Sequence, residues 1–427
     1  MSKETTNEAR DLKSNSHYST ACGECDVLIF AQTIEAGEHI RCPRCDHHIS
    51  ALGDEPVQGP IATSIAALFM MFASLSFPYL SFSASGNTAS MTFSETIRTL
   101  LSFGYDQLAL LLFITLVVLP IGFLVIVLYL HTCLLLGVKG VAVGMMLKIV
   151  RESKPWLMVD VFLIGVLVAL VKVMGMADVE FGLSFWAFCL FTGLFIKTMI
   201  LFDSHWLWHQ FYGECRIYHL PNAQTADEAD LVLCHKCGQL NPKENARCDR
   251  CLGDISVRFK DSLQRVWALL FASVVLYIPA NVLPIMDTSL LGVRDPSTIL
   301  GGVVLLWQLE SYPVAIVIFV ASVCVPIAKM LAMAWLAYSV HYVDDYNPHK
   351  QIKLYRITEF IGRWSMIDVF VVAILAALIH IDGLVAVYPG PAAVSFAAVV
   401  IMTMVAASSF DPRLIWDKTS NRKDVVA

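Results

Sequence analysis

Long apolar stretches alternate with polar blocks along the chain of 427 residues. A helix that crosses the hydrocarbon core of a bilayer, which is about 30 Å thick, needs roughly 20 mostly apolar residues. Eight stretches meet this requirement: 61–82, 107–136, 156–177, 183–203, 264–286, 313–339, 366–382 and 390–409. They form two sets of four, which are separated by the polar block 204–263 and preceded by residues 1–60. The pattern predicts an all-α polytopic membrane protein with two tandem four-helix transmembrane units.

Composition agrees with this interpretation. Hydrophobic residues make up 57% of the chain and charged residues 15%, whereas soluble domains have about 25% charged residues. The mean hydropathy of +0.64 excludes a disordered chain, and the net charge of -6 argues against a nucleic-acid-binding surface. Residues 1–20 are polar and lack the apolar stretch that a cleavable signal needs, so we expect the N-terminus to stay on the side of synthesis.

The two halves of the sequence are repeats. Two Cys-x-x-Cys pairs precede each set of helices, and shared motifs then recur at offsets of 206 to 208 residues, such as Leu119-Pro120-Ile121 with Val325-Pro326-Ile327 and Trp156–Phe162 with Trp364–Phe370. Because four helices are an even number, both units enter the membrane in the same direction, related by a pseudo-axis along the membrane normal. We expect five segments: a tail and first ribbon (1–59), the first unit (60–210), a linker and second ribbon (211–260), the second unit (261–411) and a tail (412–427).

Positive charges are distributed unevenly between alternate polar segments. The blocks 1–60, 137–155, 204–265, 340–363 and the C-terminal tail hold 25 of the 30 Lys and Arg residues, whereas 83–106 and 287–312 hold only Arg98 and Arg294. Positively charged loops remain cytoplasmic. Both termini and both cysteine blocks are therefore predicted to be cytoplasmic.

Eight of the twelve cysteines lie in four Cys-x-x-Cys pairs: Cys22, Cys25, Cys42 and Cys45 before the first unit, and Cys234, Cys237, Cys248 and Cys251 before the second. In a reducing compartment such pairs indicate metal sites rather than disulfides. Four thiolates from two tight turns are the ligand set of a structural zinc and leave no open position for catalysis. The same ligands could hold iron in an electron-transfer site. We expect two small zinc ribbons with either a structural or a regulatory role.

The other four cysteines, Cys133, Cys189, Cys215 and Cys324, have no partner at ligand spacing. Three of them lie in apolar stretches and are interpreted as small hydrophobic side chains.

Lys329 is the sharpest candidate for a functional residue inside a span. It lies in mid-span, one turn after Pro326, and Ser322 is seven residues earlier on roughly the same helix face. A lysine at the centre of a span costs roughly 3 kcal/mol on insertion, so such residues are functional hypotheses by default. The alternative is that Lys329 extends to the membrane surface.

Other polar residues could extend a polar path through the helices. Asp160 and Asp368 occupy equivalent positions about one turn into their spans, where a carboxylate also stabilises a helix N-terminus. Lys172 could equally form a surface ion pair. Thr403 is a weaker candidate because threonine commonly bonds its own helix backbone. Prolines at matched depths in the two halves, such as Pro120 and Pro326, are expected to break helices and point to a binding site, although membrane spans also tolerate proline without such a role.

Catalytic motifs are absent from the sequence. It contains no phosphate-binding loop, no Gly-x-Ser-x-Gly and no His-Glu-x-x-His. We therefore expect a protein that is not an enzyme and whose work draws on an ion gradient, a partner or the gradient of its own substrate.

The chain resembles the paraquat-inducible protein A family. The resemblance is carried by the two four-cysteine ribbons, each followed by four helices, and by the motifs 279–285 (Pro-Ala-Asn-Val-Leu-Pro-Ile), Trp364–Phe370 and Phe410–Arg413. It implies a subunit of a lipid-transport system in the bacterial inner membrane, with a partner whose mammalian-cell-entry (MCE) domains form a periplasmic tunnel. It also implies zinc at all eight paired cysteines.

Three function classes follow from these observations. The first is a transporter or loading subunit for lipids or similar hydrophobic molecules. The second is a membrane redox protein that uses the four-cysteine sites as iron centres against oxidative stress. The third is a membrane scaffold that only anchors a partner. Metal content separates the first from the second.

Overall fold

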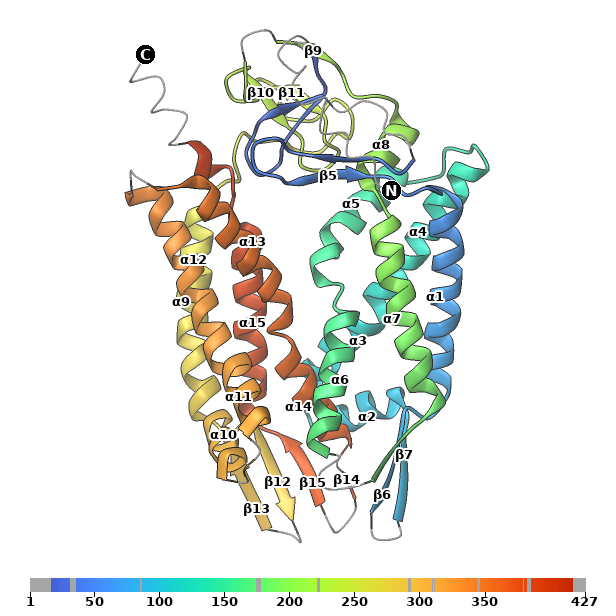
Figure 1. The fold of residues 1–427 in the computed structure, drawn as a ribbon, viewed down its shortest axis with the longest axis vertical. Coiled ribbons are helices and arrows are strands. Elements are labelled where there is room, and N and C mark those ends of the chain that lie inside the picture. The colour runs from blue at the N-terminus through green and yellow to red at the C-terminus, as the bar shows by residue number, and fades with distance from the viewer. Residues whose placement is uncertain are drawn as a thin grey trace.

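The computed structural model of the chain describes residues 17–30, 36–84, 87–173, 178–220, 223–290, 293–308, 310, 312–343, 346–378, 380–381 and 385–417. These residues are mostly helical, and Figure 1 shows two helical units side by side with strands at both ends of the molecule. We call the end that carries the paired cysteines the cysteine end, and the opposite end the strand end.

The first unit extends from α1 to α8. Its elements are α1 (Gln58–Ser76), β6 (Leu80–Ala84), β7 (Asn87–Met91), α2 (Phe93–Ser102), α3 (Asp106–Phe113), the π-helical segment η2 (Ile114–Val118), α4 (Leu119–Leu135), α5 (Val143–Ser153), the short 3-10 helix η3 (Lys154–Trp156), α6 (Val159–Val173), β8 (Asp178–Phe181), α7 (Leu183–Leu201) and α8 (Ser204–Tyr212).

The second unit repeats this order. Its elements are α9 (Ser262–Val282), β12 (Met286–Leu290), β13 (Val293–Ser297), α10 (Ile299–Gln308), α11 (Tyr312–Phe319), the π-helical segment η4 (Val320–Cys324), α12 (Val325–Tyr342), α13 (Pro348–Trp364), α14 (Ile367–Leu378), β14 (His380–Ile381), β15 (Val385–Pro389) and α15 (Pro391–Ser409). Helices α1 and α9 both run from the cysteine end to the strand end, so the two units point the same way (Figure 1).

Seven helical stretches among the described residues are long and apolar enough to cross a membrane. They are Gln58–Ser76, Asp106–Leu135, Val143–Leu170, Leu183–Leu201, Ser262–Val282, Ala315–Tyr342 and Pro391–Ser409.

The expected eighth span, 366–382, is shorter than the sequence pattern indicated. Helix α14 covers 12 residues, or about 18 Å at 1.5 Å per residue. The chain then enters β14, which pairs with β15 instead of continuing the helix. Helices α13 and α14 together form one broken helix, the counterpart of α5, η3 and α6 in the first unit.

Matched π-helical segments precede Pro120 and Pro326, so the helices are not interrupted there. Proline has no N–H and leaves the carbonyl four residues earlier without its helical donor. The backbone adjusts: the N–H at the end of each segment, Leu119 and Val325, donates to the carbonyl five residues earlier. Such π-bulges frequently mark functional sites.

The sequence pattern predicted an all-α fold. The structure is mostly helical but also contains β-sheets at the strand end. Strands β7-β6-β8 form one antiparallel sheet and β13-β12-β15-β14 another. Helices α7 and α15 each begin directly after a glycine, Gly182 or Gly390, which approaches the backbone just before the strands β6 or β12. A Cβ at either position would collide with a backbone carbonyl oxygen, that of Pro78 or Pro284. The strands were not anticipated because their short segments lie between spans and carry little apolar pattern.

The two units meet along α6 and α14. Phe162 and Phe370, which are equivalent in the repeat, contact each other edge to face with ring centroids 5.5 Å apart. Gly165 allows this approach, since a Cβ there would lie 3.3 Å from the Phe370 Cβ. At the strand end, Phe103, which directly follows α2, contacts Tyr388 of β15 with ring centroids 4.9 Å apart. Contact between equivalent residues is what a pseudo-twofold axis between parallel units requires.

Short strand pairs build the two cysteine segments. The first contains β2 (Thr20–Ala21) with β3 (Leu28–Ile29) and β4 (His39–Arg41) with β5 (His48–Ala51). The second contains β10 (Leu231–Leu233) with β11 (Leu240–Pro242), and β1 (His17–Tyr18) pairs with β9 (Tyr218–His219) across the two segments. Both segments lie together at the cysteine end (Figure 1).

Candidate functional site

Each Cys-x-x-Cys pair lies in a tight turn with the same backbone hydrogen bonds. In the first turn the N–H of Asp26 donates to the carbonyl of Cys22 at 3.0 Å, and the N–H of Cys22 donates to the carbonyl of Val27 at 2.9 Å. The residue after the second cysteine has a positive φ in all four turns: Asp26 (63°), Asp46 (58°), Gly238 (76°) and Leu252 (54°). This left-handed residue closes the turn and brings the two thiols of the pair together.

The four turns assemble two buried four-cysteine clusters. The closest Sγ–Sγ separations between pairs are 3.5 Å for Cys22 and Cys45 and 3.4 Å for Cys25 and Cys42. The second cluster has 3.6 Å between Cys234 and Cys251 and 3.5 Å between Cys237 and Cys248. Thiolates bound to one tetrahedral zinc at 2.3 Å lie about 3.8 Å apart. Both clusters therefore have the donor set and the geometry to bind a metal ion.

The first cysteine segment packs on the second helical unit. Arg356 of α13 donates to the carboxylate of Glu24 at 2.5 Å and to the Cys45 carbonyl at 2.8 Å. The guanidinium of Arg44 lies 4.3 Å from the ring centre of Trp416, beyond the end of α15. The four cysteines of this segment belong to the same buried cluster as residues of α9, α12 and α13.

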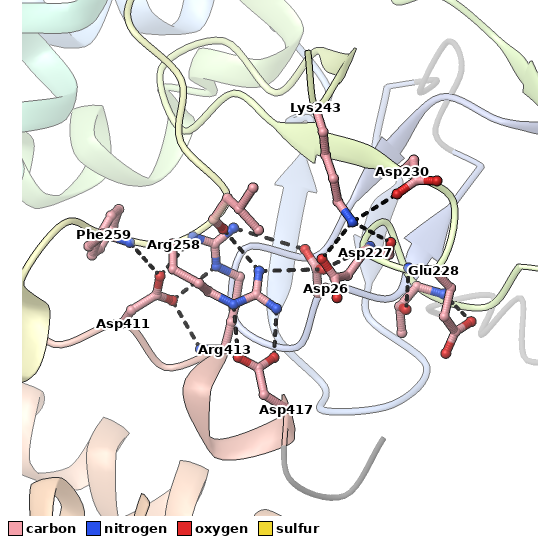
Figure 2. A network of polar contacts seen from close by, with 12 residues as sticks. Asp26, Asp227, Glu228, Asp230, Lys243, Arg258, Phe259, Asp411, Arg413 and Asp417 are labelled. Atoms are coloured by element: carbon pink, nitrogen blue, oxygen red, sulfur yellow. Dashed lines mark hydrogen bonds and ion pairs between the residues drawn. The ribbon is translucent and has the colours of Figure 1, made fainter. Parts of the chain in front are cut away.

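Figure 2 shows the ion-pair network at this contact. The buried Arg413 bonds Asp411 through Nη2 at 2.8 Å, and Arg258 bonds Asp417 at 2.6 Å. Asp26 of the first cysteine segment faces both arginines, at 3.7 Å from Arg258 and 4.0 Å from Arg413. Burial raises the pKa of Asp26 to about 6, although both arginines act to lower it.

The second cysteine segment packs on the first helical unit. Lys148 of α5 donates to the Cys251 carbonyl at 2.8 Å, and Arg250 donates to the Trp208 carbonyl of α8 at 2.8 Å. Its cysteines share a buried cluster with first-unit helices. Each cysteine segment therefore packs on the unit that does not directly follow it, and the two halves are connected across the cysteine end.

Equivalent aspartates tie each segment back to its own unit. Asp203 caps α8 by accepting from the Trp206 N–H at 3.0 Å and also accepts from the Ala51 N–H at 2.7 Å. Asp411 accepts from the Phe259 N–H at 3.0 Å, shortly before α9 begins. These bonds fix the position where the chain enters each unit from its cysteine segment.

Lys329 lies near the middle of the 28-residue stretch Ala315–Tyr342 and is 3% exposed. Its Nζ has no hydrogen-bond partner among the described residues. Gly362 of α13 provides the space for the amine, because a Cβ at this position would lie 3.0 Å from Nζ and 3.8 Å from the Met404 Cγ on α15. The side chain thus points into the second unit, between α12, α13 and α15.

The first unit is apolar at the equivalent positions. At the offsets of the repeat, Phe123 replaces Lys329, and its ring contacts Phe195 with centroids 5.5 Å apart. All of these side chains are buried: Leu116, Phe123, Phe195 and Leu157 in the first unit, and Ser322, Lys329, Thr403 and Ser365 in the second. At these four positions the first unit has apolar side chains, and the second unit has three hydroxyl groups and one amine.

Ser365 was not among the candidates from sequence. It is buried three residues after Gly362 on α13, and its Oγ has no partner among the described residues. The signal was present, since the Trp-x-Met motif has leucine at position 157 and serine at 365.

The remaining candidates take more ordinary positions. Asp160 and Asp368 lie in the first turns of α6 and α14, where a carboxylate stabilises a helix N-terminus. The Thr403 hydroxyl donates to the Val400 carbonyl at 2.9 Å within its own helix. Lys172 lies on α6, and its side chain falls outside the part of the structure that is described.

Cys215 was expected to have no metal-ligating partner, but the structure places one beside it. Its Sγ lies 3.6 Å from Nε2 of His209 and 3.1 Å from Nη1 of Arg250. Cys133, Cys189 and Cys324 are free cysteines within apolar helices, as the pattern indicated.

Comparison with known proteins identifies relatives over almost the whole chain. The family model described as paraquat-inducible protein A matches residues 57–212 and 263–420. The Intermembrane transport protein PqiA of Escherichia coli strain K12 is 40% identical over 400 residues, which is 93% of this chain and 95% of that protein. The Lipophilic envelope-spanning tunnel protein A of the same strain is 32% identical over 397 residues, 93% and 90% of the two chains.

A further relative comes from Haemophilus influenzae. Its Probable intermembrane transport protein is 32% identical over 399 residues, 92% of this chain and 95% of the relative. No solved structure matches the fold. The chain belongs to the paraquat-inducible protein A family.

Proposed function

We propose that this member of the paraquat-inducible protein A family is a multi-pass subunit of the bacterial inner membrane that moves lipids or other hydrophobic molecules between the inner and outer membranes. The names of its relatives, intermembrane transport protein and envelope-spanning tunnel protein, support this class of function and do not describe enzymes. The observation that carries the proposal is Lys329, which is buried and whose Nζ has no hydrogen-bond partner among the described residues, at a position where the first unit has Phe123. The resemblance further suggests a partner whose MCE domains form a tunnel across the periplasm.

In this proposal the second unit carries out the conformational change that moves the lipid. We use the name polar core for its four buried polar residues at positions where the first unit has phenylalanine or leucine, which are Lys329, Ser322, Thr403 and Ser365. An amine in an apolar interior can lose or gain a proton when its surroundings change. We propose that Lys329 changes its protonation as the second unit alternates between a lipid-accepting and a lipid-releasing state. Asp368, Asp160 and Lys172 are candidates for extending the proton path toward the membrane surfaces.

The cysteine end is proposed to be cytoplasmic. The sequence blocks that contain or flank the paired cysteines, together with the alternate loops 137–155 and 340–363 and the C-terminal tail, hold 25 of the 30 Lys and Arg residues, and positive loops remain in the cytoplasm. In that reducing compartment the two clusters are zinc ribbons with structural roles, and the chain divides into the segments 1–59, 60–210, 211–260, 261–411 and 412–427. Each ribbon packs on the opposite unit. Zinc would therefore stabilise the packing of the two units against each other.

Substitution of Lys329 tests the proposal in cells. Lys329→Met and Lys329→Ala should reach normal protein levels but fail to restore outer-membrane barrier function to a strain that lacks the protein. Lys329→Arg should also fail, because arginine keeps its proton. The matched control is Lys197→Met, since Lys197 lies in the apolar helix α7 but is exposed on its surface.

Full barrier function with Lys329→Met would contradict the proton-coupling role. Stoichiometric iron instead of zinc in the purified protein would favour a redox function at the four-cysteine sites. If Lys329 variants function but loss of the partner abolishes function, the protein is a scaffold.

A further inference from the structure

Three metal-binding side chains come together outside the two four-cysteine clusters. His205 and His209 lie on α8, and Cys215 follows the end of that helix. One ligand atom from each of the three lies within 4.8 Å of the other two. The Sγ of Cys215 is 3.6 Å from Nε2 of His209, and the two imidazole rings have centroids 4.8 Å apart.

Local sequence brings these side chains together. Residues four apart share one face of a helix, so both imidazoles project from the same side of α8. Helix α8 ends at Gly213, whose φ of +81° reverses the chain and returns Cys215 toward that face. The reversal is held by Arg250 of the second cysteine segment, which donates to the carbonyls of Trp208 and Gly213.

The site lies between α8 and the second cysteine segment, with both histidines half-buried and the cysteine buried. Cys215 is 5% exposed, and Nε2 of His205 is buried without a hydrogen-bond partner among the described residues. Gly238 leaves room for this imidazole, since a Cβ there would lie 3.3 Å from Nε2. A buried ring nitrogen without a partner is costly, and a metal ion would satisfy it. The N–H of Arg250 that reaches the Cys215 sulfur would support a thiolate ligand, as outer hydrogen bonds commonly do around metals.

The second unit has no such ligand set at the equivalent positions. At the offset of 208 residues, Arg413 replaces His205 and Asp417 replaces His209. Both belong to the ion-pair network of Figure 2, where Arg413 bonds Asp411 and Asp417 bonds Arg258. The contact between helix end and cysteine segment is therefore held by salt bridges in one half. In the other half the same place holds three metal-ligating side chains.

We propose that His205, His209 and Cys215 form a third metal site, which binds a divalent cation of the zinc class and fastens α8 to the second cysteine segment. A zinc ion with Zn–N near 2.0 Å and Zn–S near 2.3 Å sets its tetrahedral nitrogen and sulfur ligands about 3.6 Å apart, which matches the observed contact. Three protein ligands leave the fourth position to water. This site differs from the closed four-cysteine clusters and should exchange its metal more readily.

Metal binding by the full-length protein in detergent tests this site. The protein is dialysed against buffered free Zn²⁺, and bound zinc is measured per chain. His205→Gln, His209→Gln and Cys215→Ser should each bind one equivalent less than the unchanged protein. His39→Gln is the control, because His39 is exposed on β4. Equal zinc content in the unchanged protein and all three variants would overturn the proposal.

Alkylation of Cys215 supplies a measurement that does not depend on total zinc. Added Zn²⁺ should slow labelling of the peptide that contains Cys215 in the unchanged protein, but not in the His205→Gln/His209→Gln variant. If Zn²⁺ protects Cys215 equally in both proteins, the histidines are not ligands and the site is refuted. The outcome is independent of lipid transport, since neither measurement requires the transport partner.

Discussion

A single residue distinguishes the interiors of the two units. Lys329 and Phe123 occupy equivalent positions near the start of α12 and α4, the helices that follow the matched π-helical segments, and both are buried. Phenylalanine fills its place by contact with other rings, whereas the lysine amine fits only because position 362 has no side chain. The buried position of the Lys329 amine therefore requires glycine at position 362.

Gly362→Ala is expected to impair function through Lys329. A Cβ at 362 would lie 3.0 Å from Nζ and 3.3 Å from Cε, so the end of the flexible lysine must move. Alanine favours a helix over glycine by about 1 kcal/mol, so the variant should reach normal protein levels. Outer-membrane barrier function should fall, measured at equal protein level.

Two comparisons identify the cause. Gly122→Ala is the matched control, because nothing lies within 4 Å of a Cβ at that position in α4. The double variant Gly362→Ala/Lys329→Met should be no worse than Lys329→Met alone if both act on one site. A further loss in the double variant would show that Gly362 acts independently of Lys329.

Four-cysteine turns are the elements that hold the cysteine end together. If a preformed site is absent from the unfolded chain, the free energy of metal binding becomes free energy of folding. Cys248→Ser should lose about one zinc per chain and should make residues 231–253 sensitive to protease. The control Cys324→Ser changes an exposed cysteine of η4 and should keep its zinc. Unchanged zinc in Cys248→Ser would remove the four-thiolate assignment.

The buried pair at the end of α15 is a second structural element with a measurable role. Arg413 is 1% exposed, and Asp411 bonds it through both oxygens. Asp411→Ala would leave a buried arginine without its carboxylate, which costs about 3–5 kcal/mol in typical cases. Thermal unfolding of the purified protein should show a clear loss of stability, and Asp411→Ala/Arg413→Met should recover part of it.

An exposed ion pair is the control for this measurement of stability. Arg247 and Asp254 lie 3.7 Å apart with side chains 74% and 90% exposed. Exposed pairs contribute about 0–1 kcal/mol, so Arg247→Ala should unfold nearly as the unchanged protein does. Equal effects of Asp411→Ala and Arg247→Ala would show that the buried network has no special role.

At the scale of the whole molecule, the parallel repeat places both cysteine segments at one end and both sheets at the other (Figure 1). A cysteine introduced at Ser94 or Pro296, both exposed at the strand end, should react with a membrane-impermeant thiol reagent added from the periplasmic side. A cysteine at the exposed Glu214 should not react. The reverse labelling would place the paired cysteines in the periplasm and remove the reason to prefer zinc over disulfides.

Sequence patterns predicted those features whose residues are neighbours in the chain or recur at a fixed offset. The paired cysteines are close in sequence, and their turns form as the spacing indicates. The strands at the sheet end and the early end of α14 were missed, because pairing between β14 and β15 depends on contacts that no local pattern shows.

Residues from distant segments were the hardest to predict. Gly362 approaches Lys329 only through the packing of α13 on α12, and Cys215 meets His209 only after the chain reverses at Gly213. The packing of each cysteine segment on the opposite unit likewise depends on tertiary ion pairs, such as Glu24 with Arg356. Direct comparison of the two repeats would have exposed the exchange of Phe123 for Lys329, because that difference is present in the sequence itself.

The most direct test of the account is lipid movement in a reconstituted system. Vesicles that contain the protein and the proposed MCE-domain tunnel partner are given a pH gradient, and transfer of labelled phospholipid to acceptor vesicles is followed. Transfer by the unchanged protein and by Lys197→Met should depend on the pH gradient. Transfer by Lys329→Met and by Lys329→Arg should not exceed the background. Gradient-dependent transfer by Lys329→Met at the unchanged rate would contradict the central role of the second unit's polar core.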